Sequence, residues 1–386
     1  MFKYLLITTL AVVLLTTGIA IGEDAVPADA PGEKVSAPES FLDLSTLATR
    51  ETLTQNWFGL GESIEDRGIA IALGVTQVYQ NVLSGPIQRR RNDSYTGSYD
   101  LDVEIDVARV TGLDFLSGGT IYLGAEGSWG VGIDATSIGS IFGANADAGG
   151  DRFMDLTQYW YQQNLFNDRL RVRIGKMDIS GGFDCQGAAV GFDGNAFAND
   201  ETAQFLNGAL CNNATIPFPD LGLGVAVYVE PLDGFYLTAG VADAQADARE
   251  SGFNTAFRDE DYFMSFGETG IVTSIKSSKG PLPGAYRIGM WYSGQPMDKV
   301  NGSGEIMRDK IGAYLSFDQV ICKENSDEGD TQGLGAFFRY GLSDSDVGDP
   351  KAFYSVGVQY PGLIPTRDAA GVGLGWATGA RGRRGE

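Results

Sequence analysis

The sequence predicts an all-β protein, specifically a transmembrane antiparallel β-barrel. Three observations favour this class. Apolar and polar residues alternate in about a dozen segments from residue 68 onward, the chain starts with an export signal, and no later stretch offers the ~18 consecutive apolar residues of a membrane helix. A soluble β-sandwich or propeller is the alternative, because alternation also fits strands with one face in a protein core.

Two segments show the alternation most clearly. In the segment 100–107 one face is acidic and carries Asp100, Asp102, Glu104 and Asp106. In the segment 169–174 one face is basic and carries Arg169, Arg171 and Arg173. Aliphatic residues occupy the other face of both segments. In a membrane barrel the aliphatic face meets lipid and the charged face lines water.

Further segments with the same alternation are predicted strands. They are 69–75, 120–126, 221–230, 235–241, 286–292, 311–318, 334–340 and 353–360. A tight link at 230–234 and long links at 179–219 and 244–283 fit the short turns and long loops of an outer-membrane barrel.

The amino-terminal residues predict export. Residues 1–22 combine a basic start, an apolar run and small residues, which is typical of a cleaved signal peptide. A membrane anchor is the alternative, but the apolar run of about twelve residues is short for the ~20 that a spanning helix needs. Residues 23–40 are rich in Ala, Pro, Glu and Ser and predict a disordered leader.

Composition excludes several functions. The formal net charge of -22 argues against nucleic acid as a partner, and the absence of His removes imidazole catalysis and His-bound zinc. We expect no cofactor and no metal; the acidic run 324–330 lacks the spacing of a calcium loop. Of three Cys residues, Cys185 and Cys211 are the natural candidates for one disulfide.

Four blocks of sequence carry a family resemblance. The first is WFGLGESIEDRGI at 57–69. The second is LTQYWYQQ at 156–163 followed by DRLRVRIGKMD at 168–178. The third is FAND at 197–200, leading to FPDLGLG at 218–224 and VEPLDGFYL at 229–237. The fourth is PGLIPTRD at 361–368 with GLG at 373–375. In this order the blocks resemble the OprB-type carbohydrate-selective porins.

The resemblance implies a sixteen-stranded barrel of the bacterial outer membrane that passes small sugars by diffusion, without catalysis. It implies an entry segment with a short helix at 41–67, a barrel at 68–378 and an inward loop at about 179–219. Phe197, Asn199 and Asp200 are the constriction candidates in that loop. The basic end 379–386 departs from the family, as if the closing strands were missing.

The charged faces predict how such a pore would treat a sugar. Arg169, Arg171 and Arg173 would donate to hydroxyl groups, and the acidic face of 100–107 would accept from them. Aromatic candidates for the apolar ring faces are Tyr159, Trp160, Tyr161, Tyr122, Tyr228 and Tyr236. The alternatives are that the charges only solvate the lumen and that the aromatic residues form interfacial girdles or pack.

Two other functions stay open at this stage. One is a secreted or envelope β-protein without a pore, which would bind a ligand or serve a structural role. The other is a carboxylate-based glycosidase, for which Glu104 and Glu126 are the residues to replace. The sequence leaves open the sugar and the choice between monomer and homo-oligomer.

Overall fold

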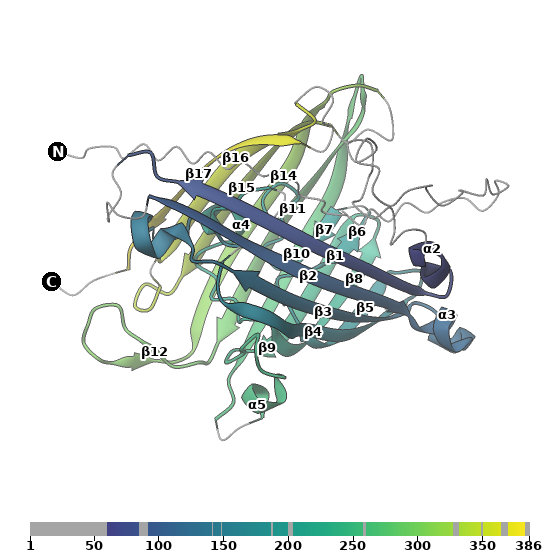
Figure 1. Ribbon diagram of the computed structural model, residues 1–386, viewed down its shortest axis with the longest axis horizontal. Helices are drawn as coiled ribbons and strands as arrows, with labels where there is room; N and C mark the ends of the chain where they lie inside the picture. The colour runs from purple at the N-terminus through teal and green to yellow at the C-terminus, as the bar shows by residue number, and fades with distance from the viewer. Residues whose placement is uncertain are drawn as a thin grey trace.

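A computed structural model describes residues 60–84, 92–140, 142–147, 149–186, 188–199, 204–257, 260–326, 332–348, 350–363 and 370–382. Most of these residues belong to one antiparallel sheet of thirteen strands, in which each strand pairs with its neighbour along the chain. Figure 1 shows the sheet curling round on itself, with α4 (Gly208–Cys211), β6 (Phe183–Cys185) and β7 (Ala188–Val190) drawn within the curve. The all-β prediction is confirmed.

Twelve of the thirteen strands have nine or more residues, close to or above the ~9–11 that cross a bilayer with tilt, and β5 (Leu170–Met177) has eight. The thirteen strands are β1 (Ile69–Asn81), β2 (Asp93–Asp106), β3 (Gly119–Trp129), β4 (Arg152–Leu165), β5 (Leu170–Met177), β8 (Gly222–Leu232), β9 (Phe235–Asp243), β10 (Phe263–Ser277), β11 (Gly280–Ser293), β14 (Lys310–Lys323), β15 (Gly333–Ser343), β16 (Ala352–Pro361) and β17 (Gly371–Ala380).

Short elements lie in the connections. They are α2 (Leu60–Glu65), α3 (Val107–Thr111), η2 (Asp114–Leu116), η3 (Asp134–Ile138), β6 (Phe183–Cys185), β7 (Ala188–Val190), α4 (Gly208–Cys211), α5 (Phe253–Ala256), β12 (Met297–Asp298) and β13 (Ile306–Met307). No helix in the described part of the chain is both long and apolar enough to span a membrane.

One predicted connection is wrong. The link 244–283 contains β10, which runs from Phe263 to Ser277 and pairs with β9 and β11. Its alternation was hidden by the small and polar residues Ser265, Gly267 and Thr269 at outward positions. The true loop is 244–262, and a turn of two residues joins β10 to β11.

The connections alternate between a short end and a long end of the sheet. Short turns lie at 166–169, 233–234 and 278–279, whereas the connections 130–151, 178–221 and 244–262 leave the opposite end. The turn at 233–234 is tight because Gly234 adopts φ 74° and its N–H donates to Glu230 Oε1 at 2.8 Å. This asymmetry is typical of outer-membrane barrels.

The two faces of the sheet differ as the alternation predicts. Ile271, Ile288 and Ile311 on the outer face are each more than half exposed, with 53%, 57% and 55% of their surface open. Inner positions of the same strands carry Glu268, Arg287 and other polar residues. An apolar exterior around a polar interior is the reverse of a soluble core, so the pattern is that of a membrane barrel.

The sheet is open in the described residues. There β1 and β17 each pair with one neighbour, and the thirteen-strand antiparallel order makes these two edges point the same way. Strand β17 continues two residues past the predicted barrel end, to Ala380.

Several sequence predictions lie wholly or partly outside the described residues. These are the signal peptide 1–22, the leader 23–40, the entry segment before Leu60 and most of the acidic run 324–330. Within the predicted entry segment, α2 is helical.

Candidate functional site

The segment 178–221 between β5 and β8 packs against the inner face of the sheet. Its apolar residues Ile179, Phe183 and Phe192 join a buried cluster with Tyr228, Tyr236, Phe266, Trp291 and Tyr314 from the strands. Phe192 stacks on Phe266 with ring centroids 4.9 Å apart. We call this segment the inner loop.

Glycines on the inner face make room for this loop. A Cβ at Gly335 would overlap the ring of Phe197, and one at Gly341 would overlap the side chains of Asn213 and Thr215. The predicted constriction residue Phe197 therefore packs on β15 rather than projecting freely. These close approaches explain part of the high glycine content, 54 of 386 residues.

Buried charges of the strands also hold the inner loop. Arg287, 2% exposed, donates from Nη1 to Asp318 Oδ2 at 2.8 Å and to the carbonyl of Gly194. Glu268 accepts from the hydroxyls of Tyr236 (2.6 Å) and Tyr314 (2.8 Å) and from the Asp193 N–H (3.0 Å). Each buried charge thus has hydrogen-bond partners, as burial demands.

Arg339 is the second anchor. It is fully buried, and its Nη1 donates to the carbonyls of Ala198 (2.8 Å) and Leu210 (2.6 Å). Its Nη2 donates to the Asp193 carbonyl at 3.3 Å and to Asn199 Oδ1, and its Nε lies 3.0 Å from Asp193 Oδ2. One guanidinium therefore ties together distant parts of the inner loop.

The loop covers one half of the interior. Inner positions of β8 to β16, such as Tyr228, Ser316 and Arg339, are completely buried. Inner positions on β2 and β3, such as Asp102 and Tyr122, keep partial exposure, and Glu104 is exposed. The polar wall of β2 to β4 is therefore the part of the interior that stays open to water.

That open wall combines acids with aromatic rings. Tyr122 donates to Asp102 Oδ1 at 2.5 Å and stacks on Trp160, with centroids 4.8 Å apart and planes 16° from parallel. The register pairs Glu104 with Tyr122 and Tyr122 with Trp160 across three strands. Acceptors for hydroxyl groups thus lie beside a flat apolar surface.

The three arginines share the inner face, and each already has partners. Arg169 forms an exposed ion pair with Asp233 at 2.5 Å, and the Arg171 guanidinium lies 5.4 Å from the Tyr228 ring. Arg173 lies between the rings of Trp160 (4.1 Å) and Phe183 (4.9 Å). It also donates to Gln162 Oε1 (2.9 Å) and to the Gly182 carbonyl (2.9 Å), which joins the open wall to the inner loop.

Two further loops fold over the long end. Loop 130–151 contacts the edge strand β1 and also β16, the neighbour of the other edge strand. Gln80 on β1 donates to the Ala144 carbonyl at 3.1 Å, and Phe142 packs on Phe353 of β16 with centroids 5.7 Å apart. Loop 244–262 is held by the buried Lys176, which donates to the carbonyls of residues 247 (3.3 Å), 248 (2.7 Å) and 250.

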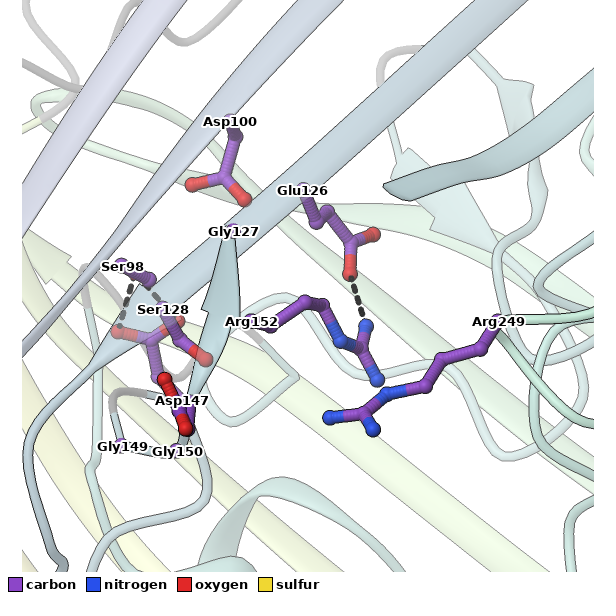
Figure 2. Close-up of a pocket in the computed structure, with 11 residues that line it drawn as sticks. Ser98, Asp100, Glu126, Gly127, Ser128, Asp147, Gly149, Gly150, Arg152 and Arg249 are labelled. Atoms are coloured by element: carbon purple, nitrogen blue, oxygen red, sulfur yellow. Dashed lines mark hydrogen bonds and ion pairs between the residues drawn. The ribbon is translucent and has the colours of Figure 1, made fainter. Parts of the chain in front are cut away.

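A polar pocket of about 210 Å³ lies where these loops meet the open wall. Figure 2 shows Asp100 and Glu126 from the wall facing Arg152 and Arg249. Arg152 lies 3.8 Å from Glu126 Oε2, and both arginines approach Asp155, at 3.3 and 3.9 Å. In the described ranges no three carboxylate or thiol residues are grouped to bind a metal ion.

Comparison with known proteins identifies this arrangement. The family model described as carbohydrate-selective porin, OprB family, matches residues 90–385. The chain belongs to the OprB family of carbohydrate-selective porins. It is therefore a carbohydrate-selective channel of the bacterial outer membrane, and the resemblance deduced from its sequence blocks is confirmed.

One solved structure supports the fold of this porin. The high-pH structure of Pseudomonas putida OprB has a TM-score of 0.66 at 20% identity and covers 84% of this chain and 78% of that one. Its low-pH structure has a TM-score of 0.47 at 17% identity, covering 84% and 82%. A mutant porin of Rhodopseudomonas blastica has 0.33 at 13%, covering 80% and 94%. No curated protein sequence matches.

Several predicted site residues of the porin lie away from the open wall. Tyr159 and Tyr161 alternate with Trp160 and so take the outer face, where the Tyr159 hydroxyl contacts the Ser251 carbonyl. Asp106 ends β2 and caps α3 by accepting from the Arg109 N–H at 3.0 Å. Asp200 lies outside the described residues.

The candidate disulfide is not formed. Cys185 and Cys211 are both buried free thiols, which contradicts the pairing expected from their proximity in sequence. Cys185 lies in the short β6–β7 hairpin, whereas Cys211 ends α4, so the inner loop carries them to different parts of its path. Burial raises the pKa of the Cys185 thiol.

Sequence reasoning missed the anchors Glu268, Arg287, Asp318 and Arg339. The available signal was the same as for the open wall, because each is a charged residue at an inward position of an alternating strand. A lone charge between aromatic neighbours, as in Phe337–Tyr340, is a weaker pattern than a row of like charges on one face of a strand.

Proposed function

We propose that sugars pass between the inner loop and the open wall of β2 to β4. The observation that carries this proposal is the unequal burial of the inner face. The loop completely covers inner residues of β8 to β16 such as Tyr228, while Asp102 and Tyr122 stay partly exposed and Glu104 is exposed. A solute therefore meets fixed protein groups on both sides.

The open wall suits a neutral sugar. Asp100, Asp102 and Glu104 supply acceptors for hydroxyl hydrogens, and the stacked pair of Tyr122 and Trp160 supplies a flat surface for the apolar ring face. Several weak contacts along a wall favour passage, because a solute that binds too tightly at one point leaves slowly.

The arginines divide between two roles in this proposal. Arg169, which is exposed in the turn before β5, and Arg171, which is partly exposed, add donors along the same face. Arg173 mainly fixes the inner loop, because its guanidinium is occupied by two rings and by two oxygen acceptors. The constriction candidates Phe197 and Asn199 act by shaping the loop, since both are held against β15.

The remaining parts of the function follow from the family and the outer surface. We infer that the signal peptide 1–22 directs export, that the apolar outer face contacts membrane lipid, and that passage involves no catalytic step. The exposed Ile271, Ile288 and Ile311 support the lipid contact, because such a belt would be costly in water.

The test uses the purified full chain in planar lipid bilayers. We expect ion-conducting channels whose current falls as glucose is added. Asp102→Asn keeps the acceptor for Tyr122 but removes one wall charge, so it should lower the preference for cations and weaken the glucose effect. Asp298→Asn makes the same change in an exposed long-end loop and should alter neither. A protein that inserts but conducts no ions contradicts the proposal.

A further inference from the structure

A second cavity lies inside the inner loop, away from the pocket of Figure 2. Its volume is about 130 Å³, and its polar lining includes Asp178, Ser180, Asp193, Asn199 and Asn212. Asn199 and Asn212 are exposed, Asp178 and Ser180 are half-buried, and Asp193 is 3% exposed. The lining thus combines two exposed amide residues with the buried Asp193.

Several hydrogen bonds fix the backbone around Asp193. The Asp193 N–H donates to Glu268 at 3.0 Å, its carbonyl accepts from Arg339, and the next carbonyl, of Gly194, accepts from Arg287 and from Ser316 Oγ at 3.0 Å. Anchors from four strands therefore fix the backbone on both sides of one side chain. Such support is typical of a preorganised binding residue.

One oxygen of the Asp193 carboxylate lacks a well-formed hydrogen bond. Oδ2 lies 3.0 Å from Arg339 Nε, while Oδ1 makes no hydrogen bond of good geometry in the described part of the chain, although Asn213 lies close enough to lower the pKa of the carboxyl. An unsatisfied buried acceptor is costly, and a donor from a ligand would remove that cost. Charged acceptors also make stronger hydrogen bonds than neutral ones.

We propose that this cavity is a sugar subsite in which Asp193 Oδ1 accepts a hydroxyl hydrogen of the passing solute. The proposal rests on the proposed function and names a contact within it. The cavity takes one hydroxyl edge of the sugar, with Asp178 as a second acceptor and the amides of Asn199 and Asn212 at the mouth. The buried edge of Phe192 completes the lining.

The charges favour a neutral donor-rich ligand over an anion. The lining brings two carboxylates and no arginine or lysine side chain, and the Arg339 guanidinium lies behind Asp193 with its donors directed to loop acceptors. A phosphate or carboxylate would meet like charges there. A divalent cation is the competing occupant, and the experiment includes it.

The test measures glucose binding from the concentration dependence of channel current, with the full chain in planar bilayers. Asp193→Asn and Asp178→Asn remove one acceptor charge each and keep the side-chain shape. Asp184→Asn removes the same charge from the same loop at a position that lines neither cavity. A difference in gel mobility between unheated and heated samples checks that each variant is folded.

We expect both cavity variants to weaken glucose binding at least tenfold with near-normal conductance, and Asp184→Asn to leave it unchanged. If Asp193→Asn changes conductance but not glucose affinity, Asp193 is an anchor and the proposal is overturned. Block of the wild type by calcium chloride alone, lost in Asp193→Asn while glucose binding persists, also overturns it in favour of a cation site. Channels without any glucose effect contradict the proposed function instead.

Discussion

Replacing Arg173 with Met tests whether this arginine fixes the inner loop. In the wild type the guanidinium is sandwiched 4.1 Å from Trp160 and 4.9 Å from Phe183 and donates to Gln162 and Gly182. Met keeps a side chain between the rings but leaves two acceptors unsatisfied. We therefore expect the β6–β7 hairpin to detach from β5 far more often.

The magnitude follows from the contacts that are lost. Two hydrogen bonds from a charged donor contribute ~1.5–3 kcal/mol each, and the cation–π contacts add ~1–2 kcal/mol. Packing of the Met sulfur against the rings recovers ~1 kcal/mol. The net loss is therefore ~3–7 kcal/mol, and its lower bound alone corresponds to a detached population more than roughly a hundredfold larger.

The assay is limited proteolysis of the inner loop, together with current noise in single channels. Arg171→Met is the matched control, because Arg171 lies on the same face of the same strand. Its guanidinium lies farther from its aromatic neighbour than that of Arg173 does, at 5.4 Å from the Tyr228 ring. Cleavage near residues 180–190 should be much faster in Arg173→Met than in the control. Equal cleavage and equal noise in the two variants would refute the anchoring role.

Three further predictions concern packing, the outer loop and pH. Gly335→Val should push Phe197 off β15 toward the open wall and lower channel conductance, because the added methyl groups occupy the place of the ring; unchanged conductance would contradict this. Lys176→Met should make loop 244–262 at least tenfold more sensitive to protease while the barrel stays heat-modifiable, because three carbonyls lose their donor. Burial raises the pKa of Asp193 to about 6, so its carboxylate is charged at pH 7.5 and mostly protonated at pH 5. Glucose affinity should fall as pH decreases through about 6, and Asp193→Asn should show no such step. The charged groups packed around the Asp193 carboxylate are Arg339, Arg287, Glu268 and Asp318.

The strands could be predicted because alternation is a local property. Leu170, Val172 and Ile174 on one side of Arg171 and Arg173 reveal both the strand and its two faces. Strand β10 was not predicted, because its outward positions include Ser265, Gly267 and Thr269, which are not apolar. Alternation fails wherever small residues occupy the lipid-facing side.

The contacts of the inner loop could not be predicted in the same way. Arg339 and Asp193 are 146 positions apart in sequence, and only the curvature of the sheet brings them together. The same is true of the thiols of Cys185 and Cys211, whose closeness in sequence suggested a bond, whereas both are free in the structure. Sequence identified which residues face inward, whereas the structure showed which of those the loop covers.

The attachment of the inner loop to one half of the barrel separates the residues that maintain the fold from those that can vary. Replacement of Arg287 or Arg339 disturbs buried partners and threatens folding. Replacement of Glu104 or Asp102 changes a water-exposed surface at little cost in stability. Selection for a new solute can therefore act on β2 to β4 first, and a laboratory library for altered sugar preference is best confined to the inward positions of these strands.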